Sequence, residues 1–190
     1  MSANDPYERL RDDPHLGPLV AEHGELSVEP HPDPFERLVV SIVNQQLSTE
    51  SAAAIRERLF DRFEVTPVGL LGADEDELRE VGLSGQKIRY VRNVAERFED
   101  GLSVERLHEL DDDAVVDELT QITGIGDWTA KMFLMFCLGR EDVFPVEDLG
   151  IRRGTEQLFG DCSRAEMVDI AERWRPYRSY ASRYLWRAVD

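Results

Sequence analysis

The sequence has few cysteines and histidines, which limits the metal chemistry that it can support. Its two cysteines, Cys137 and Cys162, cannot assemble a four-thiolate zinc or iron–sulfur site. The four histidines are scattered and do not show the spacing of zinc ligands. The sequence therefore predicts that no metal cofactor is required.

Long apolar runs and targeting signals are also lacking. The longest apolar run, residues 132–139, is far too short to span a bilayer. Residues 1–15 are polar and acidic, and they contain no basic segment followed by an apolar one, so no secretory signal is visible. We expect a soluble, cytoplasmic protein that does not interact with membranes.

Lysine is nearly absent, because Lys87 and Lys131 are the only two among 22 lysines and arginines. Asp and Glu together number 39, which gives a formal net charge of −17 at pH 7. This charge is spread along the chain and forms no acidic tail, a pattern that argues only weakly for a basic partner. The composition instead favours adaptation to a high-salt cytoplasm, where a short Debye length screens repulsion between carboxylates.

Helical periodicity is present along most of the chain, and no alternating strand pattern accompanies it. Asp33–Pro34 is a helix-start signal, Ser48 and Ser84 are typical N-caps, and Gly101 is a typical helix stop. We expect further helices near residues 67–72, 74–81, 103–109, 111–121, 127–138, 148–159, 163–174 and 176–189. The sequence therefore predicts an all-α protein.

The order of these segments indicates a two-lobed helical bundle. Residues 27–34, "SVEPHPDP", are rich in proline and separate an N-terminal arm, residues 1–30, from a helical domain, residues 31–190. A helical hairpin, residues 111–138, lies between an early and a late group of helices. We therefore expect the two lobes to lie on either side of this hairpin in the sequence.

Two glycines in "ITGIGDWTA", residues 122–130, precede the helix that opens at Asp127. Gly124 and Gly126 permit positive φ or close backbone approach, so that amides at the helix start can bind an anion such as a phosphate. Ile125, between them, is expected to fill the core between the two helices. The alternative is a tight corner in which the glycines only relieve steric strain.

Several motifs in a consistent order resemble the helix-hairpin-helix DNA glycosylase superfamily, specifically its 3-methyladenine-DNA glycosylase II branch. The hairpin is followed by the Gly/Pro-containing loop "DVFPVEDLGIRRG", and it is preceded by "SIVNQQLSTESAAAI" and "GLSGQKIRYVRNVAERF"; the segment "AERWRPYRSYASRYLWR" also matches. The resemblance covers about residues 30–190. It implies the two-lobed fold of that superfamily, with an active-site cleft between the lobes.

The resemblance implies that Asp148 is the catalytic residue, placing an anion beside the positive charge that develops on the deoxyribose. An ordinary N-cap role for the following helix is the alternative, and both roles are compatible. Glu147 is a less favoured rival. Trp128 and Trp186 match aromatic positions of the base pocket, where an alkylated, cationic purine would stack on indole; packing in the core is the alternative for both.

Trp128 also bears on the type of reaction. Lyase members of the superfamily have a lysine at this position, two residues after the second hairpin glycine, and an indole cannot form their Schiff base. The resemblance therefore implies a monofunctional enzyme that releases alkylated purines such as 3-methyladenine and 7-methylguanine and leaves the abasic site uncut. A bifunctional glycosylase/lyase and a non-catalytic DNA-binding module remain as alternatives.

The partner implied is double-stranded DNA containing damaged bases, bound by a monomer. The residues expected to contact it are Gly124, Ile125, Gly126 and Thr129 of the hairpin, Arg152, and the loop residues Gln46 and Leu47. Leu47 is the candidate wedge that fills the gap left by the flipped base; closing the turn between two helices is the alternative for both loop residues.

Two further expectations concern charge. Residues 172–190 contain five arginines against one Glu and one Asp, so they could line a basic strip within the acidic surface. The resemblance also implies a Na⁺ or K⁺ ion on the backbone carbonyls of Thr120, Ile122 and Ile125.

Overall fold

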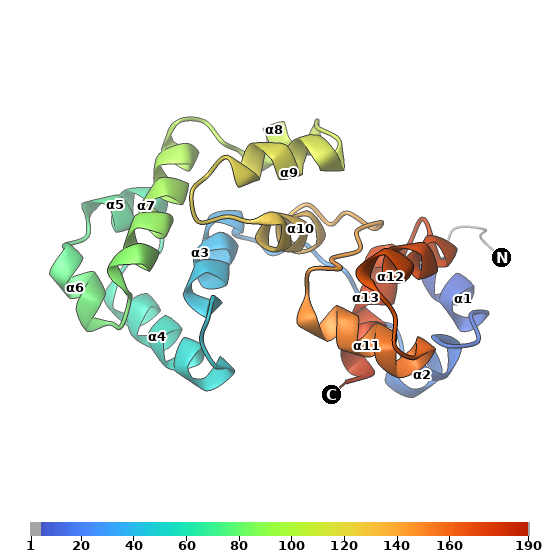
Figure 1. Ribbon diagram of the computed structural model, residues 1–190. Helices are drawn as coiled ribbons and strands as arrows, with labels where there is room; N and C mark the ends of the chain where they lie inside the picture. The colour runs from blue at the N-terminus through green and yellow to red at the C-terminus, as the bar shows by residue number, and fades with distance from the viewer. Residues whose placement is uncertain (1–4, 190) are drawn as a thin grey trace. The chain divides into compact units, whose positions relative to one another are not determined.

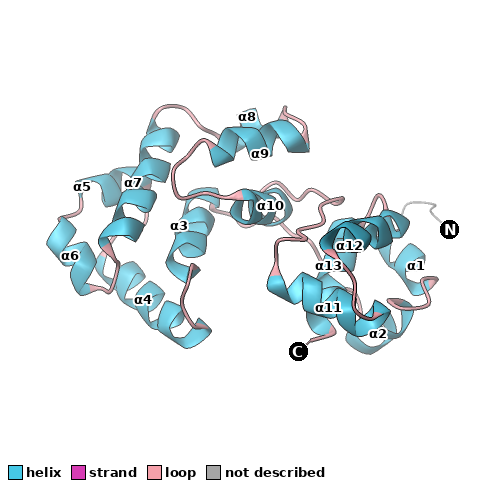
Figure 2. Ribbon diagram, in the orientation of Figure 1, coloured by secondary structure: helices cyan, strands magenta, loops and turns pink. Residues whose placement is uncertain are grey.

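The computed structural model describes residues 5–189, which consist of helices and loops without a β-strand (Figures 1 and 2). The prediction of an all-α fold is therefore confirmed. None of the helices within the described residues is long and apolar enough to cross a membrane. The α-helices are α1 (Pro6–Arg11), α2 (Gly17–His23), α3 (Pro34–Asn44), α4 (Thr49–Arg62), α5 (Pro67–Gly72), α6 (Glu75–Glu80), α7 (Gly85–Glu99), α8 (Val104–His108), α9 (Asp112–Thr120), α10 (Asp127–Phe136), α11 (Leu149–Phe159), α12 (Arg164–Ala171) and α13 (Arg178–Arg187), and a short 3₁₀ helix, η1 (Glu172–Trp174), follows α12.

The chain forms two compact units. The middle unit is the continuous segment His31–Phe133. The terminal unit combines the described residues up to Pro30 with those from Leu134 onward. The predicted cleft between two lobes concerns both units together and stays a prediction.

The middle unit is organised around α7, against which α3 and α5 pack. The helix starts predicted at Asp33, Ser48 and Ser84 are confirmed, because each side chain accepts a hydrogen bond from a backbone N–H in the first turn of its helix. Asp74, the first residue of the predicted helix 74–81, caps α6 in the same way. Apolar residues at helical spacing on these helices form its core, and they include Leu38, Val39, Ile42, Ile88, Val91 and Val94, all at most 2% exposed.

The terminal unit differs from the predicted N-terminal arm. Residues from Asp5 onward begin with two helices, α1 and α2. Leu10 of α1, Leu16 just before α2 and Val20 of α2 are buried in the same core as residues of α11, α12 and α13. The Tyr184 hydroxyl donates to the Gly24 carbonyl over 2.7 Å, across 160 positions in the sequence. The described part of residues 1–30 is therefore an integral layer of this unit, not a separate arm.

Candidate active site and DNA-contacting surfaces

Asp148 is the N-cap of α11, as the alternative interpretation of the sequence proposed. Its carboxylate Oδ1 accepts a hydrogen bond from the Ile151 backbone N–H, at 3.0 Å, and another from the Trp186 indole N–H, at 2.8 Å. Asp148 is half-buried. Two N–H donors on one oxygen fix the orientation of the carboxylate. A fixed, partly accessible anion is what stabilisation of a cationic sugar requires.

Two glycines on one face of α11 explain how Trp186 reaches Asp148. A Cβ on Gly150 would lie 2.7 Å from Trp186 Cδ1 and 3.1 Å from Asp148 Oδ1. One turn later, a Cβ on Gly154 would lie 2.2 Å from the Leu185 carbonyl oxygen. The absence of both side chains allows α13 to pack closely against α11. The glycines of "LGIRRG" therefore determine the distance between the indole and the carboxylate.

Trp186 also belongs to a small aromatic group within the terminal unit. Its ring stacks on Phe136, with centroids 6.0 Å apart and ring planes at 30°. The Arg183 guanidinium lies 5.7 Å from the centroid of the Phe136 ring. These contacts fix the indole plane from the side of α10, and they give Trp186 a role that the sequence did not predict, as a donor to Asp148.

Trp128 lies in the first turn of α10 and is half-buried. It belongs to the middle unit, whereas Asp148 and Trp186 belong to the terminal unit. The structure thus brings Asp148 and Trp186 together, while a base pocket that includes Trp128 stays a prediction.

The hairpin glycines have different roles. Gly124 has a φ of +114°, and a Cβ there would lie 2.4 Å from Cγ of Tyr90 on α7, so this position requires glycine for the fold itself. A Cβ on the exposed Gly126 would meet no atom within 4 Å. Ile125 is 5% exposed, which confirms the prediction that it fills the core. The packing within the protein gives no reason for glycine at residue 126, which is compatible with close approach by a ligand.

Two side-chain amides hold the backbone of the hairpin. Asn93 Nδ2 on α7 donates to the Thr123 carbonyl at 3.0 Å, and Gln45 Nε2 donates to the Gly124 carbonyl at 3.1 Å. In a trans peptide the N–H points opposite to the C=O. Because the Thr123 carbonyl points to Asn93, the Gly124 N–H points away from α7. Sequence reasoning missed Gln45 and Asn93 as hairpin contacts, since they lie 79 and 30 positions from their acceptors.

The predicted cation ligands lie in the same turn. The Ile122 carbonyl accepts the Ile125 N–H at 2.9 Å, which uses one of the two lone pairs of its oxygen and leaves the other for a ligand. The Thr120 hydroxyl donates to the Val116 carbonyl at 2.8 Å. The arrangement fits a cation bound by carbonyls, and the site stays a prediction.

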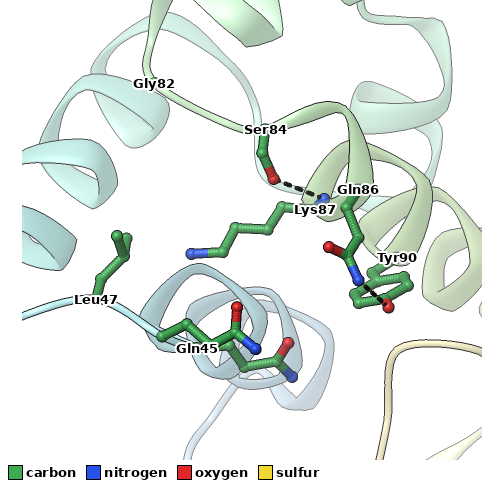
Figure 3. A pocket seen from close by; sticks show the side chains of 8 residues that line it. Gln45, Leu47, Gly82, Ser84, Gln86, Lys87 and Tyr90 are labelled. Carbon is green, nitrogen blue, oxygen red and sulfur yellow. Dashed lines mark hydrogen bonds between the residues drawn. The ribbon is translucent and has the colours of Figure 1, made fainter.

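Gln46 and Leu47 are exposed on the loop between α3 and α4, as expected of residues that contact DNA. They border a cavity of about 290 Å³ that is also lined by Lys87 and Tyr90 of α7 (Figure 3). Lys87 Nζ donates to the Val43 carbonyl at 2.7 Å, and partial burial lowers the pKa of this ammonium group. Gln46 has a φ of +56°, the single positive φ of a non-glycine residue between residues 5 and 189.

Thr129 differs from expectation. It is 3% exposed, so its side chain faces the protein interior and does not offer a surface for DNA. The predicted DNA contact at Thr129 stays a prediction. Arg152, in contrast, is half-buried on α11, one turn after Asp148, and its Nε has no hydrogen-bond partner.

The basic strip expected from residues 172–190 does not form at Arg175 and Arg178. Arg175 pairs with Asp142 at 2.9 Å, and Arg178 pairs with Asp142 at 2.7 Å. Both also pair with Glu172. These two arginines therefore stabilise the terminal unit, and their charge is neutralised locally.

Comparison with known proteins indicates the family of the chain. Residues 39–176 match the family model described as the HhH-GPD superfamily base excision DNA repair protein. DNA-3-methyladenine glycosylase 1 of Schizosaccharomyces pombe is 33% identical over 82% of this chain and 72% of its own length. A putative DNA-3-methyladenine glycosylase of Bacillus subtilis is 30% identical over 82% of this chain, which spans 59% of that relative.

Two solved structures are similar over nearly the whole chain. The crystal structure of a DNA-3-methyladenine glycosidase from Bacillus halodurans is 37% identical, with a TM-score of 0.84, and the match covers 99% of this chain and 91% of that one. The Schizosaccharomyces pombe 3-methyladenine DNA glycosylase in complex with abasic DNA is 30% identical, with a TM-score of 0.86 and coverage of 96% and 95%. The chain therefore belongs to the HhH-GPD superfamily of base excision DNA repair proteins, in the branch of the DNA-3-methyladenine glycosylases.

Proposed function

We propose that this protein is a monofunctional DNA glycosylase that flips alkylated purines, such as 3-methyladenine and 7-methylguanine, out of double-stranded DNA and releases them by hydrolysis, acting as a monomer. The observation that supports this most directly is the Asp148 carboxylate, held by the Ile151 and Trp186 N–H groups in a chain of this family. The similar protein from Schizosaccharomyces pombe has been solved with abasic DNA, which is the product of such a reaction.

The chemistry follows from the charge of the groups involved. Cleavage of the bond between base and sugar develops positive charge on the deoxyribose, and Asp148 supplies a negative charge with a fixed direction. A ring-methylated purine is already cationic and therefore a good leaving group, so no strong general acid is needed. Its charge also favours stacking on indole, by about 0.5–2 kcal/mol.

The residue at position 128 supports the absence of a lyase step. Trp128 occupies the position of the Schiff-base lysine, and its indole N–H is not a nucleophile. Borohydride treatment during the reaction should trap no covalent complex between protein and DNA. A trapped complex would instead establish the bifunctional mechanism.

The deciding experiment compares the wild type with Asp148→Asn for base release from methylated duplex DNA at high salt. Asn is as good an N-cap as Asp, so the variant should keep the start of α11 while losing the charge. Base release should fall by about 10²- to 10³-fold, the usual effect of removing one electrostatic stabiliser. Equal release by both proteins would contradict the role of Asp148. Tight DNA binding without release by either would indicate a non-catalytic binding module.

We also propose that the carbonyls of Thr120, Ile122 and Ile125 bind a Na⁺ or K⁺ ion that stabilises the hairpin. The support is the second lone pair of the Ile122 carbonyl and the resemblance of the hairpin to its family. If this is so, the melting temperature should depend on which monovalent cation is supplied at constant ionic strength.

A further inference from the structure

The loop Gln46–Leu47 is held at its base by residues from two other helices. Lys87 of α7 donates to the Val43 carbonyl in the last turn of α3, and Arg56 of α4 donates to the Asn44 side chain. The loop then turns through Gln46, whose positive φ is unfavourable for a residue with a side chain and persists only where the surroundings impose it. Gln46 and Leu47 therefore project from a rigid base.

Gln45, the residue before this turn, contacts the hairpin. Its backbone N–H donates to the Ile42 carbonyl at 3.2 Å, which fixes it to the end of α3. Its side-chain amide donates to the Gly124 carbonyl at 3.1 Å. Gly124 packs closely against the ring of Tyr90, so it cannot move toward α7 without a clash. One side chain thus joins two surfaces that are separated by 79 positions in the sequence.

We propose that Gln45 is a positioning residue that couples the Gln46–Leu47 loop to the hairpin, so that DNA binding at the hairpin and insertion of the loop into the duplex are one cooperative event. This inference rests on the proposed function, in which both surfaces contact DNA. Gln45 itself is half-buried and acts through its neighbours.

The coupling has a physical basis in the stiffness of the contact. A phosphate that binds the hairpin amides restricts the motion of the peptide that follows Gly124. The hydrogen bond from Gln45 to the Gly124 carbonyl passes this restriction on to the end of α3. A methyl group on Gly126 would meet no atom within 4 Å, so it would not contact Leu47 directly. The effects of changes at separated positions combine multiplicatively to within about a factor of two. Coupled positions depart from additivity by more than this.

The test is a double-mutant cycle on the affinity for a duplex that contains a tetrahydrofuran abasic analogue. Leu47→Ala shortens the proposed wedge, and Gly126→Ala adds a methyl group that meets no protein atom within 4 Å and that would obstruct the proposed approach of DNA to the hairpin. With Gln45 present, the loss of affinity in the double variant should differ from the product of the two single losses by about threefold or more. The cycle is then repeated in Gln45→Leu, where the two losses should multiply within about twofold.

Two further variants control the measurement. Gln45→Glu keeps the length of the side chain but cannot donate when ionised, and it should abolish the coupling as Gln45→Leu does, which provides a second test if the leucine variant folds poorly. Gln86→Leu removes another amide that lines the same cavity, one that donates to the Tyr90 hydroxyl, and it should leave the coupling intact. Coupling that persists without the Gln45 amide, is absent from the wild type, or is lost equally in Gln86→Leu would overturn the proposal.

The result is separable from the proposed function. Base release from methylated DNA is measured on the same proteins. Release without coupling would refute only the role of Gln45, whereas coupling in affinity without release would support Gln45 and contradict the glycosylase activity.

Discussion

Trp186→Phe removes the indole N–H that donates to Asp148 while keeping an aromatic ring against Phe136. A hydrogen bond to a charged acceptor contributes about 1.5–3 kcal/mol. Because Asp148 is half-buried, water can replace part of this, and we take about 1–1.5 kcal/mol as the loss at the transition state. Each 1.36 kcal/mol corresponds to a tenfold change in rate, so base release should slow by about five- to fifteenfold.

The reason is geometric. Ile151 and Trp186 both donate to the same carboxylate oxygen, and loss of the Trp186 N–H removes one of the contacts that fix the orientation of the carboxylate. Single-turnover release of methylated purines at saturating protein measures the chemical step, and binding of the abasic analogue measures affinity. The rate should fall, while the affinity stays within about threefold of the wild type.

Trp174→Phe is the matched control, because the Trp174 indole N–H also donates to a carboxylate of the same unit, Asp13 Oδ2 at 3.0 Å. This variant should lower the melting temperature and leave the rate of base release unchanged. An unchanged rate of base release in Trp186→Phe would refute the role of this hydrogen bond in the reaction. A faster rate would also refute it, because it would mean that the bond had reduced the negative charge that Asp148 offers to the sugar. A fall in affinity without a fall in rate would indicate that Trp186 acts only as a pocket wall.

Three other predictions concern stability and charge. Gly154→Ala should lower the free energy of unfolding, measured by urea denaturation, by about 1–3 kcal/mol. The added methyl group would lie 2.2 Å from the backbone oxygen of Leu185, which can move only with α13. An unchanged free energy of unfolding would contradict the close approach of α11 and α13. Tyr180 has its pKa raised to about 12 by burial and by its hydrogen bond to Glu141, so the folded state keeps a proton that the unfolded state loses. The raised pKa of Tyr180 contributes to the free energy of unfolding in full below about pH 10, and this contribution is lost as the pH rises to about 12. Thermal melts of Tyr180→Phe should lack this part of the pH dependence. Arg178→Gln should lower the melting temperature but leave the dependence of DNA affinity on salt unchanged, because its charge is already paired; a shallower salt dependence would show that it contacts phosphate.

Helix starts could be predicted from the sequence because their signals are local. Ser48 and Ser84 accept from N–H groups only three residues away, and Asp33 with Pro34 fixes both the cap and the first φ. The same signal at Asp5–Pro6 starts α1, yet we expected an arm there. A helix of six residues is not stable alone, and α1 depends on a core that is completed by residues far along the chain.

The site was predictable only in part, because some of its contacts also join residues that are far apart in the sequence. Asp148 could be identified as a cap and, by resemblance, as the catalytic residue. Its bond to Trp186 could not, because it spans 38 positions and depends on the space left by Gly150. The prediction of a basic strip was wrong at Arg175 and Arg178 because their partner Asp142 lies outside residues 172–190, 33 positions before Arg175 and 36 before Arg178.

The division of the chain also has a consequence for folding during synthesis. The middle unit is one continuous segment and can become compact as soon as residue 133 has left the ribosome. The terminal unit cannot, because the partners of Asp13 and Gly24 lie about 160 residues later, at Trp174 and Tyr184. The apolar side chains of α1 and α2 therefore stay exposed while most of the chain is made. At roughly 5–20 residues per second this interval lasts on the order of ten seconds or more, long enough for a chaperone to bind.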